Sequence, residues 1–436
     1  MSTDTAHDQD LSSLPPVHES WLPREHSLYR PRHGGQGLAL VCAAVFFCVP
    51  ILGYTVGVRP AAVENHQPRS FPSPLDGWGF LTGLSPWATD NLPFRDLAIQ
   101  AEDDISRSVF GEPPSYGDAP RTGPIPSTGD SSGDSPSGGE NVPSAGFPTV
   151  VEGKDGWLFY GYDLRGKCRP NRPLDQTIAN VQRLRTAVER SGRRFVLVVA
   201  PDKSTMVPEK LPDSYAGKAC AAGPRQEFWQ RANAELRVVD LRQALEREVT
   251  RRNGPLYFPQ DTHWNFAGGL TMTREVAERL QPGVTSTWSS TLGPQWESEA
   301  DLPKMIGRTG VNRAIRYSLA PDGGTDRTNF GATDFGRTLY FDTPPASGTV
   351  DTSVTMFADS FAQFATPYLA ATFTRISVTH LTTLADNPRG VANSLRFGET
   401  VVIEVVERNL AAGNGPVSDP AVIDVLVEAI AANPLR

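Results

Sequence analysis

The sequence VTMFADSFAQFATPYLAATF, at residues 354–373, places an apolar strand directly before a helix. Residues 354–357 form a mostly apolar stretch that is typical of a buried strand, and aromatic side chains recur at helical spacing after it. Ser360 would therefore stand at the turn, where the helix starts. The unpaired N–H groups and the dipole of a helix N-terminus favour a developing negative charge, so Ser360 is a candidate nucleophile for acyl transfer.

Helices and apolar strands alternate on both sides of this stretch, over about residues 149–436. Further strands are predicted at 195–200, 236–241, 256–258, 376–378 and 401–405, and further helices after Asp175 and near 225–235, 242–250, 265–280 and 420–432. This order predicts a doubly wound α/β domain with a mostly parallel sheet. In such sheets the functional site lies at the carboxyl ends of the strands.

A second stretch, LYFPQDTHWNFAGGL at residues 256–270, offers a base for the serine. A serine hydroxyl needs a base to take its proton, and the base needs a carboxylate to hold its tautomer. Of the histidines beyond residue 58, only His263 has an aspartate beside it, Asp261. Two simpler interpretations stay open, namely a polar capping loop for Asp261 and His263 and an ordinary N-cap for Ser360.

Four other residues near these strand ends are candidates for substrate binding. Trp264 could stack on a sugar ring, although a tryptophan that packs the loop would look the same in sequence. Asp202 and Lys203 follow the strand at 195–200 and could line the cleft or form a structural ion pair. Arg408 ends a buried strand and could steer an anionic polymer or pair with Glu407.

The run GLALVCAAVFFCVPILGYTVGV, at residues 37–58, has no charged residue. As a helix it would extend roughly 33 Å, enough to cross the hydrocarbon core of a membrane. A cleaved signal peptide is the alternative, but the 36 residues before the run are long for one. The arginines on either side give a weak bias toward a cytoplasmic N-terminus, which would leave the remainder outside the cytoplasm.

The composition divides the rest of the chain into recognisable segments. Residues 1–36 read as a disordered cytoplasmic tail and 59–112 as a membrane-proximal helical segment. Residues 113–148 are rich in Gly, Ser and Pro and read as a flexible linker. The catalytic domain is then expected over 149–436.

Charge and cysteine content exclude some classes of function. The net charge is −8 and no Lys/Arg cluster is present, which argues against nucleic-acid binding. No Cys/His spacing indicates a metal site, and we expect no cofactor. Cys168 and Cys220 could form a disulfide in an oxidising compartment, although two unrelated thiols remain an alternative.

From about residue 71 to 410 the chain resembles the AlgX/AlgJ family of alginate O-acetylation proteins. The resemblance rests on DNLPFR at 90–95, VVEGKDGWLFY at 150–160, VAPDKSTMVPEKLP at 199–212, DTHWN at 261–265, ADLPKMIG at 300–307, DSF at 359–361 and VIEVVER at 402–408. It implies a circularly permuted SGNH hydrolase-like domain, flavodoxin-like with three α/β/α layers. It also implies a triad of Asp261, His263 and Ser360. Ala358 stands where the family usually has glycine, and alanine is unstrained there only if φ is negative.

The same resemblance implies an extracytoplasmic O-acetyltransferase. A membrane-bound O-acyltransferase would supply the acetyl group, and a polysaccharide hydroxyl would accept it. Two alternatives remain at this point: an acetyl esterase with the same triad, and a non-catalytic protein of polysaccharide assembly or glycan binding.

Overall fold

The computed structural model describes residues 35–58, 71–74, 77–91, 93, 101, 105, 108, 147–331 and 337–435. The predicted cytoplasmic tail, apart from its last two residues, and nearly all of the predicted linker lie outside these residues. The described part falls into two compact units. The N-terminal unit includes the described residues up to 93, and the larger unit includes residues 101, 105 and 108 and those from Phe147 onward. Each is described by itself.

The N-terminal unit contains helices α1 (Gly35–Thr55) and α2 (Trp78–Asn91). Within α1, residues Gly37–Thr55 have a mean hydropathy of 2.3, so the helix is long and apolar enough to cross a membrane. The ring of Tyr54, near the end of α1, contacts the ring of Trp87 at 5.3 Å between centroids. The rest of the predicted membrane-proximal segment lies almost wholly outside the described residues.

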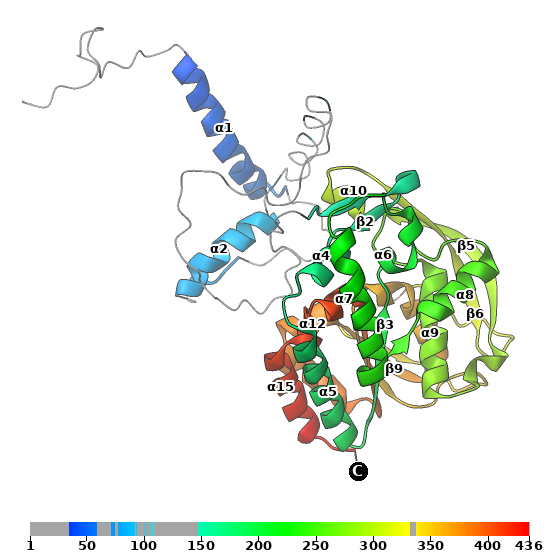
Figure 1. Ribbon diagram of the computed structural model, residues 1–436. Coiled ribbons are helices and arrows are strands. Elements are labelled where there is room, and N and C mark those ends of the chain that lie inside the picture. Colours follow the sequence, from blue (N-terminus) through cyan, green and yellow to red (C-terminus); the bar gives the residue numbers. More distant parts are fainter. Residues whose placement is uncertain are drawn as a thin grey trace, which may run out of the picture. The chain divides into compact units, whose positions relative to one another are not determined.

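The larger unit is built on a six-stranded sheet with the order β4-β3-β10-β8-β9-β7. Its strands are β3 (Arg194–Ala200), β4 (Val239–Asp240), β7 (Leu339–Asp342), β8 (Val354–Ala358), β9 (Arg375–His380) and β10 (Thr400–Val406). Strands β3 and β9 of this sheet are labelled in Figure 1. All neighbours are parallel except β7, which runs antiparallel to β9 at the edge. The last strand in sequence, β10, is thus central in the sheet.

Two apolar cores cover the two faces of this sheet. Along β3, Val196 and Val198 belong to one core while Leu197 and Val199 belong to the other, as expected for a strand buried on both faces. Helices α5 (Leu174–Arg190) and α15 (Pro420–Ala431) pack on one face, whereas α9 (Phe266–Leu280) and α11 (Thr366–Thr372) pack on the other (Figure 1). The predicted three-layer α/β architecture is confirmed.

Shorter helices fill the connections between these elements. They are α4 (Tyr162–Cys168), α6 (Lys203–Met206), α7 (Lys218–Arg231), α8 (Arg242–Arg252), α10 (Asp301–Met305), α12 (Leu381–Asp386), α13 (Pro388–Ala392) and α14 (Glu407–Ala411). Cys168 of α4 and Cys220 of α7 form the predicted disulfide, with their Cα atoms 5.3 Å apart.

Two antiparallel hairpins lie outside the main sheet. One joins β1 (Val150–Glu152) to β2 (Leu158–Tyr160), and the other joins the long strands β5 (Ser289–Glu299) and β6 (Val311–Ala320). Helix α10 lies in the connection between β5 and β6. Neither hairpin was predicted from the sequence.

Three predicted elements need correction. The strand predicted at 236–241 is reduced to β4, because the helical turn Ala232–Leu236 occupies its first residue. Residues 256–258 are not a strand of the sheet, because Tyr257 forms only an isolated bridge with Trp264. The helix predicted over 360–373 is divided into a short 3-10 helix, η9 (Ser360–Phe364), and α11. Pro367 explains the division, because it lacks an N–H group and is favoured in the first turn of a new helix.

Candidate active site

Ser360, His263 and Asp261 form a continuous hydrogen-bonded array. Ser360 follows β8, and its Oγ lies 2.8 Å from Nε2 of His263. Nδ1 of His263 lies 2.7 Å from Oδ1 of Asp261. Since Nδ1 faces a carboxylate it carries the ring proton, and Nε2 is then free to accept the proton of the Ser360 hydroxyl. The array has the connectivity that nucleophilic acyl transfer requires.

Asp261 is held by four hydrogen bonds. Besides the His263 ring, its Oδ1 accepts from the His263 backbone N–H at 3.0 Å. Its Oδ2 accepts from Nδ2 of Asn312 at 2.7 Å and from the backbone N–H of Asp301 at 3.2 Å. Both new partners come from the β5–β6 hairpin region, so this hairpin orients the Asp261 carboxylate.

Burial and charge act in opposite directions on the ionisation of these groups. Burial raises the pKa of Asp261, but the charge of His263 and the hydrogen bonds from His263 and Asn312 outweigh it and lower the pKa to about 2. Burial lowers the pKa of His263, but Asp261, and to a lesser degree Asp301, outweigh it and raise that pKa above its ordinary value. Asp261 is thus ionised at neutral pH and supports the imidazolium form of His263.

The Asp359 carboxylate holds the turn that carries Ser360 through two hydrogen bonds. One carboxylate oxygen of Asp359 caps η9 by accepting from the Phe361 N–H at 3.0 Å, and the other accepts from the Val406 N–H at 2.6 Å. Positive φ occurs among the described non-glycine residues at Asp155, Arg237 and Asn253, and not at Ala358. Alanine therefore fits where the family usually has glycine, without backbone strain.

A close approach of α9 to η9 brings the two halves of the triad together. A Cβ added at Gly269 of α9 would lie 2.1 Å from the carbonyl oxygen of Phe364, so only glycine allows this packing. The helix begins just after His263, and Asn265 caps it by accepting from the Ala267 N–H at 2.9 Å. The loop of His263 is thereby held against the loop of Ser360.

Lys203 is buried beneath the loop that carries Asp261. Its Nζ donates to the carbonyl oxygens of Asp261 at 2.6 Å and of Phe258 and Pro259 at 3.2 Å each. Burial lowers its pKa to about 8. These contacts favour a structural role for Lys203 over contact with substrate.

Asp202 and Arg408 belong to a buried network of charges at the carboxyl ends of β3 and β10. Asp202 pairs with Lys167, and Nη1 of Arg408 lies 3.5 Å from the carboxylates of both Asp202 and Asp163. The Arg408 guanidinium also lies over the Phe361 ring, next to the nucleophile. Both residues are in ion pairs, but the partners differ from those expected from the sequence: Asp202 pairs with Lys167 and Arg408, and Glu407 pairs with Lys167.

Trp264 is fully buried, and its Nε1 donates to the carbonyl oxygen of Phe361 at 2.9 Å. Its contacts favour the packing alternative over the stacking of a sugar. Ser360, in contrast, is partly exposed, while Asp261 and His263 are each 5% exposed. Ser360 is thus the member of the array that is most accessible to a substrate.

Asp261, His263 and Asp301 offer potential metal-ligand atoms that all lie within 4.8 Å of one another. Each of these side chains is already engaged: Nδ1 of His263 donates to Asp261, and the Asp301 carboxylate accepts from both the N–H and the hydroxyl of Thr262. The donor set fits a hydrogen-bonded network better than an ion site.

Asp301 and Asn312 are functional candidates that were not identified from the sequence. Asp301 lies in ADLPKMIG at 300–307, one of the stretches that carry the resemblance, but its spacing alone indicates no catalytic role. Asn312 had no such signal, since its position opposite Asp261 depends on the unpredicted hairpin.

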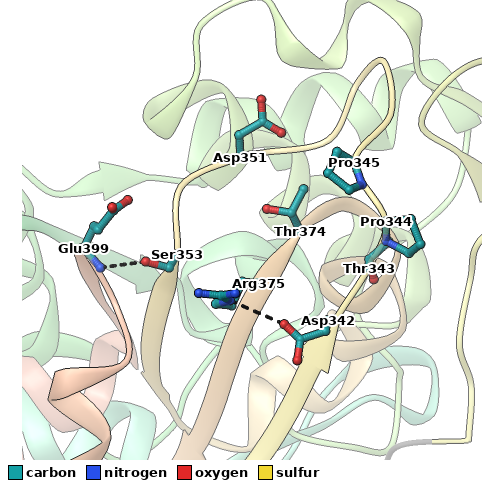
Figure 2. A pocket seen from close by; sticks show the side chains of 9 residues that line it. All are labelled: Asp342, Thr343, Pro344, Pro345, Asp351, Ser353, Thr374, Arg375 and Glu399. Atoms are coloured by element: carbon teal, nitrogen blue, oxygen red, sulfur yellow. Dashed lines mark hydrogen bonds and ion pairs between the residues drawn. The ribbon is translucent and has the colours of Figure 1, made fainter.

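A separate hollow of about 530 Å³ lies at the end of the sheet where β8, β9 and β10 begin (Figure 2). Its lining includes Ser353, just before β8, whereas Ser360 follows the end of that strand. Because β8 is five residues long, its two ends are roughly 16 Å apart. In Figure 2, Arg375 points toward Asp342, with which it pairs at 3.5 Å. This hollow is not part of the triad site.

The chain is similar to known proteins over the domain that carries this site. Residues 150–336 match the family model described as "SGNH hydrolase-like domain, acetyltransferase AlgX", a range that includes Asp261 and His263 and ends before Ser360. Two relatives, each named "Probable alginate O-acetylase AlgJ", come from Pseudomonas syringae pv. tomato and Pseudomonas aeruginosa. They are 29% and 32% identical over 31% and 33% of this chain. The matched part is 34% of each relative, so the chain spans about a third of their length.

Among solved structures, the chain is similar to one described as "O-Acetyltransferase Domain of Pseudomonas putida AlgJ". The identity is 17% and the TM-score 0.44, with 64% of this chain and 99% of that chain covered.

Proposed function

We propose that this chain, which carries an SGNH hydrolase-like domain of the AlgX/AlgJ family, is an O-acetyltransferase that moves acetyl groups onto hydroxyls of a polysaccharide. The main support is the array of Ser360, His263 and Asp261, with its distances of 2.8 Å and 2.7 Å. The relatives are named for alginate, but the contacts described at the site do not identify a particular glycan.

The geometry suits a two-step transfer through an acetyl-serine. Oγ of Ser360 attacks the carbonyl carbon of the donor acetyl while Nε2 of His263 takes the hydroxyl proton, and the resulting imidazolium returns that proton to the leaving group. A sugar hydroxyl then gives its proton to His263 and attacks the acetyl-serine, and Ser360 leaves with the proton restored. The backbone N–H of Ser360 is the proposed donor to the oxyanion.

The proposed location is the outer side of a membrane, with α1 as the single span. The apolar helix and the disulfide between Cys168 and Cys220 support this, because disulfides persist in oxidising compartments. A membrane-bound O-acyltransferase would supply the acetyl group, as the resemblance to the family implies.

Substitutions in the triad test the proposal. In the full chain, Ser360→Ala should abolish both acetyl release from an activated ester and transfer to an oligosaccharide. His263→Ala should cost nearly as much, and combining the two should cost little more, because triad members act as a unit. Asp261→Asn should be milder, since nucleophile and base remain.

Ser353→Ala, at the opposite end of β8, is the matched control and should behave as the wild type. Wild-type activity in Ser360→Ala would refute the triad. Acetyl transfer to water far faster than to any sugar would indicate an esterase. Glycan binding without either activity, even with the acyl-supplying partner present, would indicate a non-catalytic protein.

A further inference from the structure

His263 faces a second carboxylate besides the triad acid. Oδ2 of Asp301 lies 3.6 Å from Nδ1 of His263. The hydroxyl of Thr262 lies between them, 2.6 Å from Oδ2 of Asp301 and 3.1 Å from Nδ1 of His263. Nδ1 carries a single proton, which already donates to Asp261, so the Thr262 hydroxyl shares that proton as a second, longer acceptor. The Asp301 carboxylate can only accept when ionised, so the hydroxyl donates its own proton to Asp301.

We propose that Asp301 is a positioning residue, which acts through Thr262 to hold the His263 ring and to stabilise its protonated form during acetyl transfer. The inference rests on the proposed function, because it concerns the same reaction. Asp301 does not touch the reacting atoms. It adds a negative charge on the side of the ring that becomes positive when Nε2 takes the serine proton.

The backbone contacts fix Asp301 in this place. Its carboxylate also accepts from the Thr262 N–H at 3.0 Å, and its own N–H donates to Asp261 at 3.2 Å. Asp301 therefore joins helix α10 to the loop of the triad acid from both directions. The other charged groups near the ring are Asp261 on its own loop, Arg408 of α14 and Lys203 of α6.

The charge of Asp301 should vary within the working pH range. Burial, and then repulsion from Asp261, raise the pKa of Asp301 to about 6. As pH falls through about 6 its negative charge is lost, and with it this support for the imidazolium. Above that pH the charge is present, and it raises the pKa of His263.

The test is a pH titration of His263 in the full chain with Asp301→Asn. Asparagine keeps the size and an acceptor oxygen but removes the charge, so the pKa of His263 should fall by roughly one unit. The acid limb of kcat/KM should then move to lower pH by the same amount, while the plateau should fall roughly tenfold because the transition state loses charge support. The pKa is read by NMR of labelled histidine, with the signal assigned by its loss in His263→Asn.

Glu299→Gln removes the same charge from an exposed position of the same hairpin, where Glu299 pairs with Lys304, and should leave both readouts unchanged. An unshifted His263 pKa in Asp301→Asn would overturn the inference. The inference would also be overturned if Asp301→Asn had wild-type activity while Asp301→Ala was inactive. A purely structural role needs the acceptor oxygen and not the charge. The NMR titration needs no turnover, so its outcome is separate from the fate of the proposed function.

Discussion

Asn312 is the side chain that reaches the triad acid from the β5–β6 hairpin. We expect Asn312→Ala to lower kcat/KM about tenfold, because Oδ2 of Asp261 loses the shorter of its two hydrogen bonds, the one of 2.7 Å from Asn312. The backbone bonds from His263 and Asp301 remain, so activity should not be abolished. The measurement is acetyl transfer over a range of substrate concentrations.

Arg313→Ala is the control for this variant. Arg313 is the next residue of β6, its side chain is exposed, and it pairs with Glu297 across the hairpin. It should leave the kinetics unchanged. If Asn312→Ala is as active as Arg313→Ala, the hairpin does not orient Asp261.

The sequence identified the residues that stand near the start of a helix, Ser360 and His263, and missed those that reach the site from elsewhere. Ser360 and His263 could be predicted because apolar runs and helical spacing place them, and because acyl transfer needs their chemistry. Asp301 and Asn312 depend on the pairing of β5 with β6. The residues of β5 are mostly exposed and include a register shift between Leu292 and Gln295, so no apolar alternation indicated the hairpin.

At the scale of the element, the contact between α9 and η9 gives an unusual prediction. Alanine normally stabilises the interior of a helix relative to glycine by about 1 kcal/mol. Gly269→Ala should do the opposite and lower the free energy of unfolding by about 1–3 kcal/mol, because its Cβ would collide with the Phe364 carbonyl. Thermal unfolding of the variant measures this.

The matched control is Gly223→Ala in α7, where an added Cβ meets nothing within 4 Å. This change should be neutral or stabilising. Equal stability changes at the two positions would show that α9 can move away from η9 at no cost.

The sequence from 360 to 373 predicts one helix from its aromatic spacing, whereas the structure has two, η9 and α11. The aromatic spacing is genuine, since Phe361, Phe364 and Tyr368 are all buried in one core. Their periodicity did not reveal the break before α11. Pro367 was the available signal, because proline is favoured in the first turn of a helix and marks a new start.

At the scale of the whole molecule, the proposed topology can be tested directly. An alkaline phosphatase fused after residue 435 should be active, because the span would leave the catalytic domain outside the cytoplasm, where the enzyme can form its disulfides. A cytoplasmic reporter at the same position should be silent. The reverse pattern would place the domain in the cytoplasm and remove the basis for an extracellular acceptor.

The central place of β10 has a consequence for how the protein is made. Strands β3 and β4 form one half of the sheet and β8, β9 and β7 form the other, and only residues 400–406 join them. A ribosome delivers β10 after every other strand of the sheet, so each half keeps an open edge, which can pair with other chains, until residues 400–406 are made. A chain truncated before residue 400 should therefore lack a joined sheet and be prone to aggregate.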